Sequence, residues 1–348
     1  MAETEEPTKR RSRTGRNPAM VDVARLAGVS HQTVSRVLND HPNVRPQTRL
    51  RVQAAMTQLG YRPNTAARAL VTGRSQVIGV VAQNTTLYGP ASLLAAFEQS
   101  AADAGFAVAV ASVRTLDRSS ITEAVERHLG QRVAGIVVIA PVVSAGQALD
   151  HMPDDVPLVC IDGDPSRSAP LVTVDQAAGA AMATQCLLDA GHETVWHVAG
   201  PSDWFDALGR LIGWRSTLTA NGIEPPPPMP ADWSPSSGYA TGQVLARMPE
   251  VTAVFAANDH LALGIMKALR EHGRDVPRDV SIVGFDDLPE APYFVPPLTT
   301  IRPDFRAVAS ETLAALLQQL ESGGPVRRER RTVVPSLIVR ESVAPPRR

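Results

Sequence analysis

The chain has 348 residues, of which 44% are hydrophobic and 20% charged, and its formal net charge is −1. This length predicts two or three domains, and the composition excludes a chain that is disordered throughout. The longest apolar stretch, residues 133–143, is too short to span a bilayer and residues 1–18 lack the apolar core of a secretory signal, so we expect a cytoplasmic protein without membrane contact.

Charge is distributed unevenly along the chain. Residues 1–76 hold thirteen Lys and Arg against five Asp and Glu, a net of +8, which leaves −9 for the remainder. A basic segment is typical of a protein that binds the phosphate backbone, whereas an acidic body resists lying along DNA. We expect residues 1–18 to form a flexible basic tail that either contacts phosphates or only keeps the chain soluble.

Residues 19–62 show the pattern of a helix-turn-helix domain. The apolar positions of two short runs each share one helical face: Val23, Ala24 and Ala27, then Val34, Val37 and Leu38. Gly28 allows a tight turn between the runs, and Ser30 is suited to cap the helix that begins at His31. A third run ends at Gly60 and buries Val52, Ala55, Met56 and Leu59.

The second helix presents a polar face opposite its apolar one. We expect His31, Gln32 and Arg36 to reach base edges in the major groove, with Arg36 suited to guanine and Gln32 to adenine. Contacts to phosphates, which set register without reading sequence, are expected from Thr33, Ser35, Asn39 and Thr48. Two other interpretations are a generic three-helix bundle with a solvated face and a chromatin-like architectural protein.

Residues 63–75 form a predicted hinge. Asn64 is placed to cap a short Ala-rich helix, and Gly73 is placed to end it. If residues 64–71 fold as a helix only when paired with the same segment of a dimer mate, Leu70 is positioned as a minor-groove wedge that kinks the duplex. The alternative is a flexible linker in which Leu70 packs on the rest of the chain.

From residue 76 the pattern changes to α/β. Short β-branched runs predict strands at 77–82, 106–111, 135–139, 158–161, 194–198, 253–255 and 281–285. Amphipathic runs predict helices at 121–129, 177–190, 260–272 and 305–320. This alternation indicates parallel sheets covered by helices, and its length favours two doubly wound lobes. The Pro-rich residues 223–230 are expected to form a stiff extended loop.

Motifs for enzymatic chemistry are missing from the sequence. There is no GxGxxG, no phosphate-binding GKS or GKT, no GxSxG and no paired metal ligands, and residues 191–196 (GHETVW) lack the second histidine of a zinc protease. Cys160 and Cys186 lie in apolar segments, and we expect buried thiols. We therefore expect no cofactor, no metal and no catalytic residues, which disfavours an enzyme with a DNA-binding head.

Several strings resemble the lactose-repressor/galactose-repressor family of bacterial transcription regulators. In the head they are DVARLAGVSHQTVSRVLN and LGYRPN, and further along IGVV, RLIGW, DWSPSSG, AANDHLALG, VGFDD and VPPLTTIRPDF. The resemblance implies a two-lobed sensor like the periplasmic sugar-binding proteins at residues 76–343, which binds an effector and dimerises. Its N-lobe would comprise about 76–175 and 305–332, its C-lobe about 176–301 and 333–343, and residues 344–348 would form a tail.

The resemblance also implies an effector site in the cleft between the lobes. Asp162, Asn258 and Asp286 follow predicted strands, where ligands of open α/β sheets bind. By resemblance Arg210, Asn258 and Asp286 would hold sugar hydroxyls, with Asp162 nearby, and the pocket would be walled by Trp233, Phe305, Tyr88, Pro90 and Leu93. The alternatives are helix caps at the two aspartates, a core position for Trp233 and a surface charge at Arg210.

Two positions depart from what the resemblance implies. His31 stands where a tyrosine is expected on the recognition helix, and Asp206 stands near Arg210 where a small hydroxyl residue is expected. An acidic Asp206 facing the cleft would disfavour phosphorylated or carboxylate effectors, so we favour a neutral sugar such as a galactoside or another disaccharide.

Together these features predict a repressor of carbohydrate-utilisation genes. A symmetric homodimer would bind a pseudo-palindromic double-stranded operator, and the effector would weaken hinge pairing and release the DNA. The alternative is a corepressor, in which a non-sugar ligand such as a purine strengthens DNA binding. Because the sequence shows no leucine-rich tetramerisation segment, we expect dimers.

Overall fold

The computed structural model describes residues 18–38, 41–61, 75–83, 86–145, 156–163, 170–322 and 329–347. The chain divides into two compact units, Met1–Arg74 and Ser75–Arg348. None of the helices in the described ranges combines the length and the hydropathy that a bilayer crossing requires.

The first unit contains three helices, α1 (Met20–Ala27), α2 (His31–Leu38) and α3 (Pro46–Leu59). Their apolar faces meet in one small core, in which Val23, Val34 and Val52 are fully buried. Gly28 ends α1 with a left-handed backbone at φ 63°, which is the conformation that a residue without a Cβ adopts most easily. The core therefore forms where the helical periodicity places the apolar residues.

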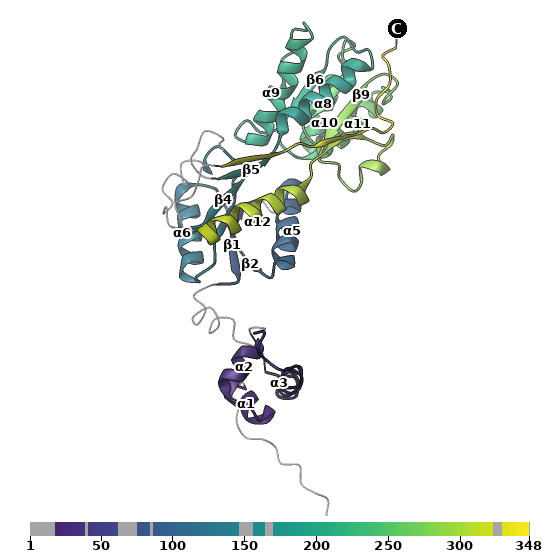
Figure 1. Cartoon of the computed structure of the whole chain (residues 1–348). Helices are drawn as coiled ribbons and strands as arrows, with labels where there is room; N and C mark the ends of the chain where they lie inside the picture. Colours follow the sequence, from purple (N-terminus) through teal and green to yellow (C-terminus); the bar gives the residue numbers. More distant parts are fainter. Residues whose placement is uncertain are drawn as a thin grey trace, which may run out of the picture. The chain divides into compact units, whose positions relative to one another are not determined.

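The second unit begins with a sheet in the strand order β11-β5-β4-β3-β1-β2, and every pairing in it is parallel. Helices α5 (Tyr88–Asp103) and α12 (Phe305–Ser322) pack on one face, and α6 (Arg118–Gly130) packs on the other (Figure 1). The strands are β1 (Val77–Gln83), β2 (Ala107–Val113), β3 (Ile136–Ile139), β4 (Leu158–Ile161), β5 (Leu171–Val174) and β11 (Arg330–Val333). We call this part the N-lobe.

A second sheet, in the order β12-β10-β9-β8-β6-β7, forms the C-lobe. Helices α8 (Gln176–Asp189) and α9 (Phe205–Ala220) cover one face, and α10 (Pro235–Leu245) and α11 (Asp259–Glu271) cover the other. The strands are β6 (Trp196–Ala199), β7 (Met229–Pro230), β8 (Ala253–Ala256), β9 (Ser281–Phe285), β10 (Thr299–Arg302) and β12 (Ser336–Ile338), and a short helical turn, η1 (Ala291–Tyr293), follows β9. The chain thus leaves the N-lobe after β5, returns in α12 and β11, and ends in the C-lobe.

The seven predicted strands are present, each within two residues of its expected ends, and the four predicted helices are present as well. The sheets differ from the prediction in one strand, since β12 pairs antiparallel with β10. The Pro-rich loop is also not wholly unpaired, because its last two residues form β7 at the edge beside β6. A proline is tolerated there because an edge strand has one side without partners.

The end of the chain is packed on the C-lobe. The backbone N–H of Ala344 donates to Ser281 Oγ over 3.0 Å, and Arg347 Nη1 lies 2.7 Å from Asp279 Oδ1. The packed segment therefore continues past residue 343, where the sequence analysis places the start of a tail. Of the two cysteines, Cys160 is buried as expected, whereas Cys186 is half-exposed because it lies on α8 away from the core-facing positions Ala183 and Leu187.

Candidate DNA-reading face and effector site

In the helical head, α2 presents a continuous polar face. His31, Gln32 and Arg36 are exposed, while Thr33 and Ser35 on α2 and Thr48 on α3 are half-buried. Asn39, and with it the hinge residues Asn64 and Leu70, lie outside the described residues.

The start of α2 is fixed by its cap. The backbone N–H of Thr33 donates to Ser30 Oγ over 3.1 Å, which satisfies one of the N–H groups that a helix leaves free at its first turn. Val34 and Val37 hold the opposite face in the core at 0% and 6% exposure. The local sequence therefore sets both where the helix begins and which side chains face outward.

In the second unit, Arg210 is the centre of a buried polar cluster. It lies on α9 and is 4% exposed. Its Nε donates to Gln176 Oε1 over 2.9 Å, its Nη1 donates to the Ala257 carbonyl, and its Nη2 lies 3.4 Å from Asp286 Oδ1. Arg210 is thus not the surface charge that the sequence left open.

Aromatic rings hold the plane of the Arg210 guanidinium. Its Cζ lies 3.7 Å from the centroid of the Phe285 ring and 5.4 Å from that of Trp233. A cation over an aromatic face is attracted by the ring quadrupole, and the attraction strengthens away from water. These rings and the three hydrogen-bonding partners leave Arg210 a single orientation, with its ion pair directed at Asp286.

Three carboxyl groups surround this one guanidinium. Burial raises the pKa of Asp286 to about 6, with the Arg210 charge opposing the rise and that of Asp206 adding to it. Burial also raises the pKa of Asp162 well above its usual value, again assisted by the charge of Asp206. The pKa of Asp206 is raised by burial as well, against the effect of Arg210. The cluster therefore has a surplus of buried carboxyl groups.

The two aspartates that follow strands β4 and β9 do not cap helices in the described structure. Asp162 accepts a hydrogen bond from Thr173 Oγ1 over 2.8 Å, and Asp286 is paired with Arg210. Asn258 is the cap: its Oδ1 accepts from the Leu261 N–H over 2.8 Å. Its Nδ2 donates to the Trp233 carbonyl over 3.2 Å, so Asn258 also fixes the backbone that carries the aromatic wall.

Trp233 lies in the partly buried wall of the cluster. Its ring meets Trp204 edge to face, with 5.6 Å between the centroids. The ring covers Gly200 so closely that a Cβ there would lie 2.3 Å from a ring carbon, so only glycine fits. Trp233 Nε1 is buried and has no hydrogen-bond partner among the described residues. Trp233 is therefore not simply a core residue, because its ring borders Arg210.

The N-lobe contributes a second aromatic pair. Tyr88, at the start of α5, and Phe305, at the start of α12, have centroids 6.2 Å apart. Burial raises the pKa of Tyr88, and the charge of Asp286 adds to the rise. Pro90 is buried on α5, and Leu93, 3% exposed, belongs to the N-lobe core.

The two lobes are joined beside the cluster by backbone hydrogen bonds. The N–H of Val143 donates to the Asp203 carbonyl over 2.9 Å, and the N–H of Phe205 donates to the Pro141 carbonyl over 2.8 Å. Trp204 lies between these C-lobe residues, is 8% exposed and packs in an N-lobe core cluster. These contacts bring Asp206 of the C-lobe next to Asp162 of the N-lobe.

Comparison with known families agrees with both parts of this description. Residues 19–64 match the family of bacterial regulatory proteins, lacI family, and residues 184–343 match the periplasmic binding protein-like domain. The lactose operon repressor of Escherichia coli (strain K12) is 35% identical over 329 residues, which are 94% of this chain and 91% of that protein. The chain belongs to the lacI family.

Other relatives and solved structures extend this match over the whole chain. The HTH-type transcriptional regulator CelR of Thermobifida fusca is 34% identical and covers 94% of this lacI-family chain and 98% of CelR. The crystal structure of the lac repressor dimer bound to operator and the anti-inducer ONPF superposes with a TM-score of 0.85 at 33% identity, covering 94% of this chain and 100% of that one. A CelR–cellobiose complex superposes with a TM-score of 0.68 at 30% identity, covering 93% and 99%.

These comparisons confirm the predicted family and fold class, a helix-turn-helix head followed by a two-lobed α/β sensor. They also confirm the predicted class of function, because the lacI-family relatives are DNA-binding transcription regulators and none of those named here is an enzyme. This lacI-family protein is therefore a DNA-binding transcription regulator.

Three residues of the cluster were missed by sequence reasoning. Gln176 is the first residue of α8 and carries no motif of its own, although it directly precedes the helix predicted at residues 177–190. Phe285 resembles any core residue of a buried strand, and its second role under Arg210 depends on tertiary packing. Trp204 stands two residues before Asp206, and a tryptophan beside a suspected binding residue was the available signal.

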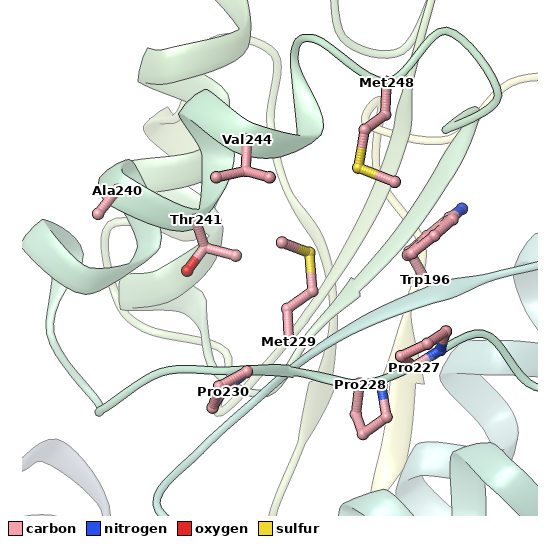
Figure 2. Close-up of a pocket in the computed structure, with 9 residues that line it drawn as sticks. All are labelled: Trp196, Pro227, Pro228, Met229, Pro230, Ala240, Thr241, Val244 and Met248. Atoms are coloured by element: carbon pink, nitrogen blue, oxygen red, sulfur yellow. The ribbon is translucent and has the colours of Figure 1, made fainter.

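A separate apolar pocket lies on the C-lobe at the edge formed by β7 (Figure 2). Its volume is about 460 Å³, and it is lined by Trp196, Pro227, Pro228, Met229, Pro230, Ala240, Thr241, Val244 and Met248. Because this lining offers a single side-chain hydroxyl and no charge, it lacks the convergent polar groups that orient a sugar. The polar cluster around Arg210 is the better candidate for the effector site of this lacI-family regulator.

Proposed function

We propose that this regulator represses carbohydrate-utilisation genes and is released from a pseudo-palindromic operator by a neutral sugar. The observation that carries the proposal is the buried cluster in which Asp162, Arg210 and Asp286 converge between two aromatic pairs. Vicinal hydroxyl groups are bound by carboxylate and guanidinium groups, and the apolar face of a sugar ring packs on aromatic rings. The buried Trp233 Nε1, which has no partner among the described residues, is a further donor.

The surplus of carboxyl groups supports a sugar without phosphate or carboxylate. Asp206, Asp162 and Asp286 face one guanidinium whose donors already bind Gln176, Ala257 and Asp286. An anionic effector would meet uncompensated negative charge in a buried site, which is costly. Neutral hydroxyl groups instead donate hydrogen bonds to these oxygens. The relatives named for lactose and for cellobiose make disaccharides the first ligands to test.

For DNA we propose that His31, Gln32 and Arg36 read base edges, and that Thr33, Ser35, Asn39 and Thr48 contact phosphates. The exposure of the first three on one face of α2 supports this assignment. We further propose that residues 64–71 form the hinge, with Asn64 as its cap and Leu70 as the minor-groove wedge.

We propose a homodimer as the working state, since two heads are needed to bind both halves of a palindrome. The second unit exposes large apolar side chains on the C-lobe, with Tyr293 at 82%, Val295 at 78% and Leu263 at 42%. The similar lac repressor structure is that of a dimer.

The test begins with a thermal-shift screen of lactose, cellobiose, galactose and ribose, because a ligand that binds only the folded state raises the melting temperature. Selection of bound duplexes from a random pool then supplies the operator. We expect one enriched palindrome, release of the protein from it by a sugar that raises the melting temperature, and recovery of that sugar unchanged. Enrichment of no motif, tighter operator binding with sugar, or conversion of the sugar would each contradict the proposal.

A further inference from the structure

The loop that carries Asp286 has an unusual backbone. Asp286 has φ 104° and Asp287 has φ 49°, although neither is a glycine. Positive φ at a residue with a Cβ is disfavoured, and such residues persist only where their surroundings fix them. The orientation of the Asp286 side chain toward Arg210 therefore depends on whatever holds residues 286–288.

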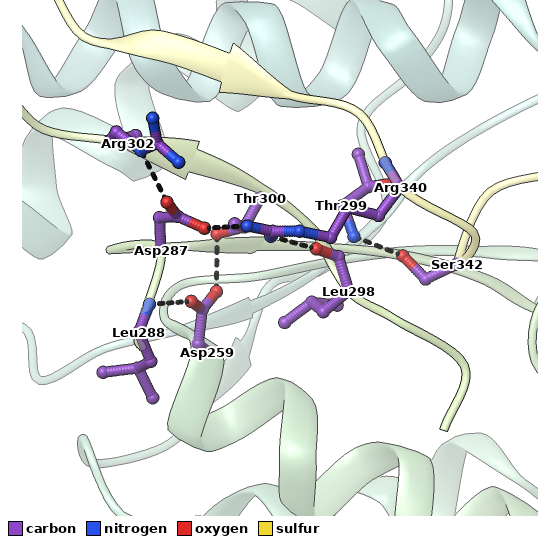
Figure 3. Close-up of polar contacts among 9 residues, drawn as sticks. All are labelled: Asp259, Asp287, Leu288, Leu298, Thr299, Thr300, Arg302, Arg340 and Ser342. Atoms are coloured by element: carbon purple, nitrogen blue, oxygen red, sulfur yellow. Dashed lines mark hydrogen bonds and ion pairs between the residues drawn. The ribbon is translucent and has the colours of Figure 1, made fainter. Parts of the chain in front are cut away.

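Two arginines hold the carboxylate of Asp287 (Figure 3). Arg302 Nε lies 2.5 Å from Asp287 Oδ2, and Arg340 Nη2 lies 2.6 Å from Asp287 Oδ1. The Asp287 side chain is 7% exposed, that of Arg340 is 14% exposed, and that of Arg302 is 53% exposed. The contact with Arg340 is thus the shielded one, in which an ion pair is stronger and its loss more costly.

Arg340 is itself fixed to the neighbouring strands. Its Nη1 donates to the Leu298 carbonyl over 2.7 Å, and its backbone N–H donates to Thr299 Oγ1 over 2.9 Å. Two residues later, Ser342 Oγ donates to the Ile282 carbonyl over 2.6 Å and accepts from the Thr299 N–H over 2.8 Å. The segment after β12 is therefore anchored to both β9 and β10, and it places Arg340 beside the Asp287 carboxylate.

The same loop has two further anchors. The Asp286 N–H donates to the Ile301 carbonyl over 2.8 Å, and the Leu288 N–H donates to Asp259 Oδ2 over 2.8 Å. Asp259 is fully buried and also accepts from Thr300 Oγ1 over 2.5 Å. Backbone bonds thus hold each side of Asp287, while the ion pairs hold its side chain.

We infer that Arg340 is a positioning residue for the effector site: through Asp287 it holds the loop that directs Asp286 at Arg210 and the effector. This inference rests on the proposed function for the role of Asp286. Arg340 lies more than fifty residues after Asp286 in sequence. Under this inference it contributes to sugar binding without contacting the sugar.

The first test is a double-mutant cycle on sugar affinity. Arg340→Gln, Asp286→Asn and the double variant are titrated with lactose and cellobiose by calorimetry, with Arg347→Gln as the matched control from the same segment. We expect Arg340→Gln to weaken sugar binding about tenfold alone but less than about twofold in the Asp286→Asn background, because coupled residues are not additive. Arg347→Gln, whose partner Asp279 is far along the chain from the loop, is expected to change affinity less than about twofold.

Equal losses from Arg340→Gln in both backgrounds would overturn the inference, since the arginine would then act on stability alone. If Asp286→Asn left the binding of both sugars unchanged, the proposed function would fail at this residue. The inference would still be decided by a measurement without ligand.

That second measurement is thermal unfolding between pH 4 and pH 7 without sugar. Burial raises the pKa of Asp286 to about 6, so the wild type and Asp286→Asn differ in the pH dependence of their melting temperature. If Arg340 positions the loop, Arg340→Gln lets Asp286 reach water. In the Arg340→Gln background, Asp286→Asn should then change the pH dependence of the melting temperature less than half as much as it does in the wild type. A lowered melting temperature with this difference fully retained would overturn the inference.

Discussion

The DNA-reading face and the effector cluster are built in opposite ways. The face on α2 takes its side chains from one short stretch, residues 31–36, in which only Val34 faces the core, and those proposed to read bases are exposed. The cluster collects Asp162, Arg210 and Asp286 from three distant parts of the chain, and each is at most 8% exposed. The head is therefore preorganised by local helix structure, whereas the sensor depends on the relative position of two lobes. A site assembled from two lobes changes when the lobes move relative to each other, which suits regulation by a small molecule.

The largest expected effect is a loss of sugar affinity that leaves operator affinity unchanged. Arg210→Ala removes the only cation that contacts Asp286 in the described cluster and should lower sugar affinity by about a hundredfold or more, since an uncompensated buried charge costs about 3 kcal/mol or more. Operator affinity without sugar should change less than about threefold, because the head folds as its own unit. Calorimetry with sugar and gel-shift titration with operator measure the two affinities. Unchanged sugar affinity would remove Arg210 from the site.

A substitution in the helical head should have the opposite result, a loss of operator affinity with sugar affinity retained. Arg36→Ala should weaken operator binding about ten- to a hundredfold by removing a bidentate contact to a base, and should leave sugar affinity unchanged. Arg25→Ala is the matched control on α1, where an exposed arginine pairs with Asp22, and should cost less than about threefold. An equal loss from both variants would show that Arg36 contributes charge and not base recognition.

A smaller effect tests the aromatic wall. Gly200→Ala places a Cβ 2.3 Å from the Trp233 ring, so the ring must shift, and overpacking of this kind costs about 1–3 kcal/mol. We expect about a tenfold loss of sugar affinity with the operator affinity retained. Gly130→Ala is the control, because its Cβ meets nothing within 4 Å. If both variants bound sugar like the wild type, Trp233 would not wall the site.

The smallest effect is a pH dependence confined to the sensor. Because burial raises the pKa of Asp286 to about 6 in the folded protein, from an ordinary aspartate value of 3.8, the protonated form is favoured by folding. The stability that this group contributes is complete below about pH 4 and is lost as the pH rises through about 6. The melting temperature of the sensor should therefore fall about 2–4 °C more across this range in the wild type than in Asp286→Asn. An identical pH profile for both would show that Asp286 is solvated.

The same contrast explains what the sequence predicts. Helix periodicity, the Ser30 cap and the Gly28 turn specify the head because each depends on neighbours within four residues. Strands β4 and β9 were located to the residue, and the aspartates after them were correctly placed at the sheet ends. Strand β11 (RRTV) is polar and partly exposed, and β12 has only three residues, so neither shows the apolar run that marks β4. Gln176 and Phe285 acquire their roles only when α9 brings Arg210 against them, which no local pattern records.

The backbone at Asp286 and Asp287 was likewise beyond local prediction. VGFDD reads as a strand followed by two polar residues, and glycine is the residue expected at positive φ. The positive φ values occur where Arg302 and Arg340 reach Asp287 from other segments of the chain. The sequence predicted that Asp286 follows a strand, and tertiary contacts determine how its side chain is held.

The central claim is that the two sites form one switch, and the affinity for a selected operator with and without a bound sugar tests it most directly. Fluorescence anisotropy of labelled operator, measured at saturating lactose or cellobiose, gives both affinities. The account predicts at least a tenfold loss of operator affinity in the wild type, within the usual range of allosteric coupling, and no loss in Arg210→Ala. A sugar that binds the wild type at the Arg210 cluster while leaving operator affinity unchanged would contradict the account.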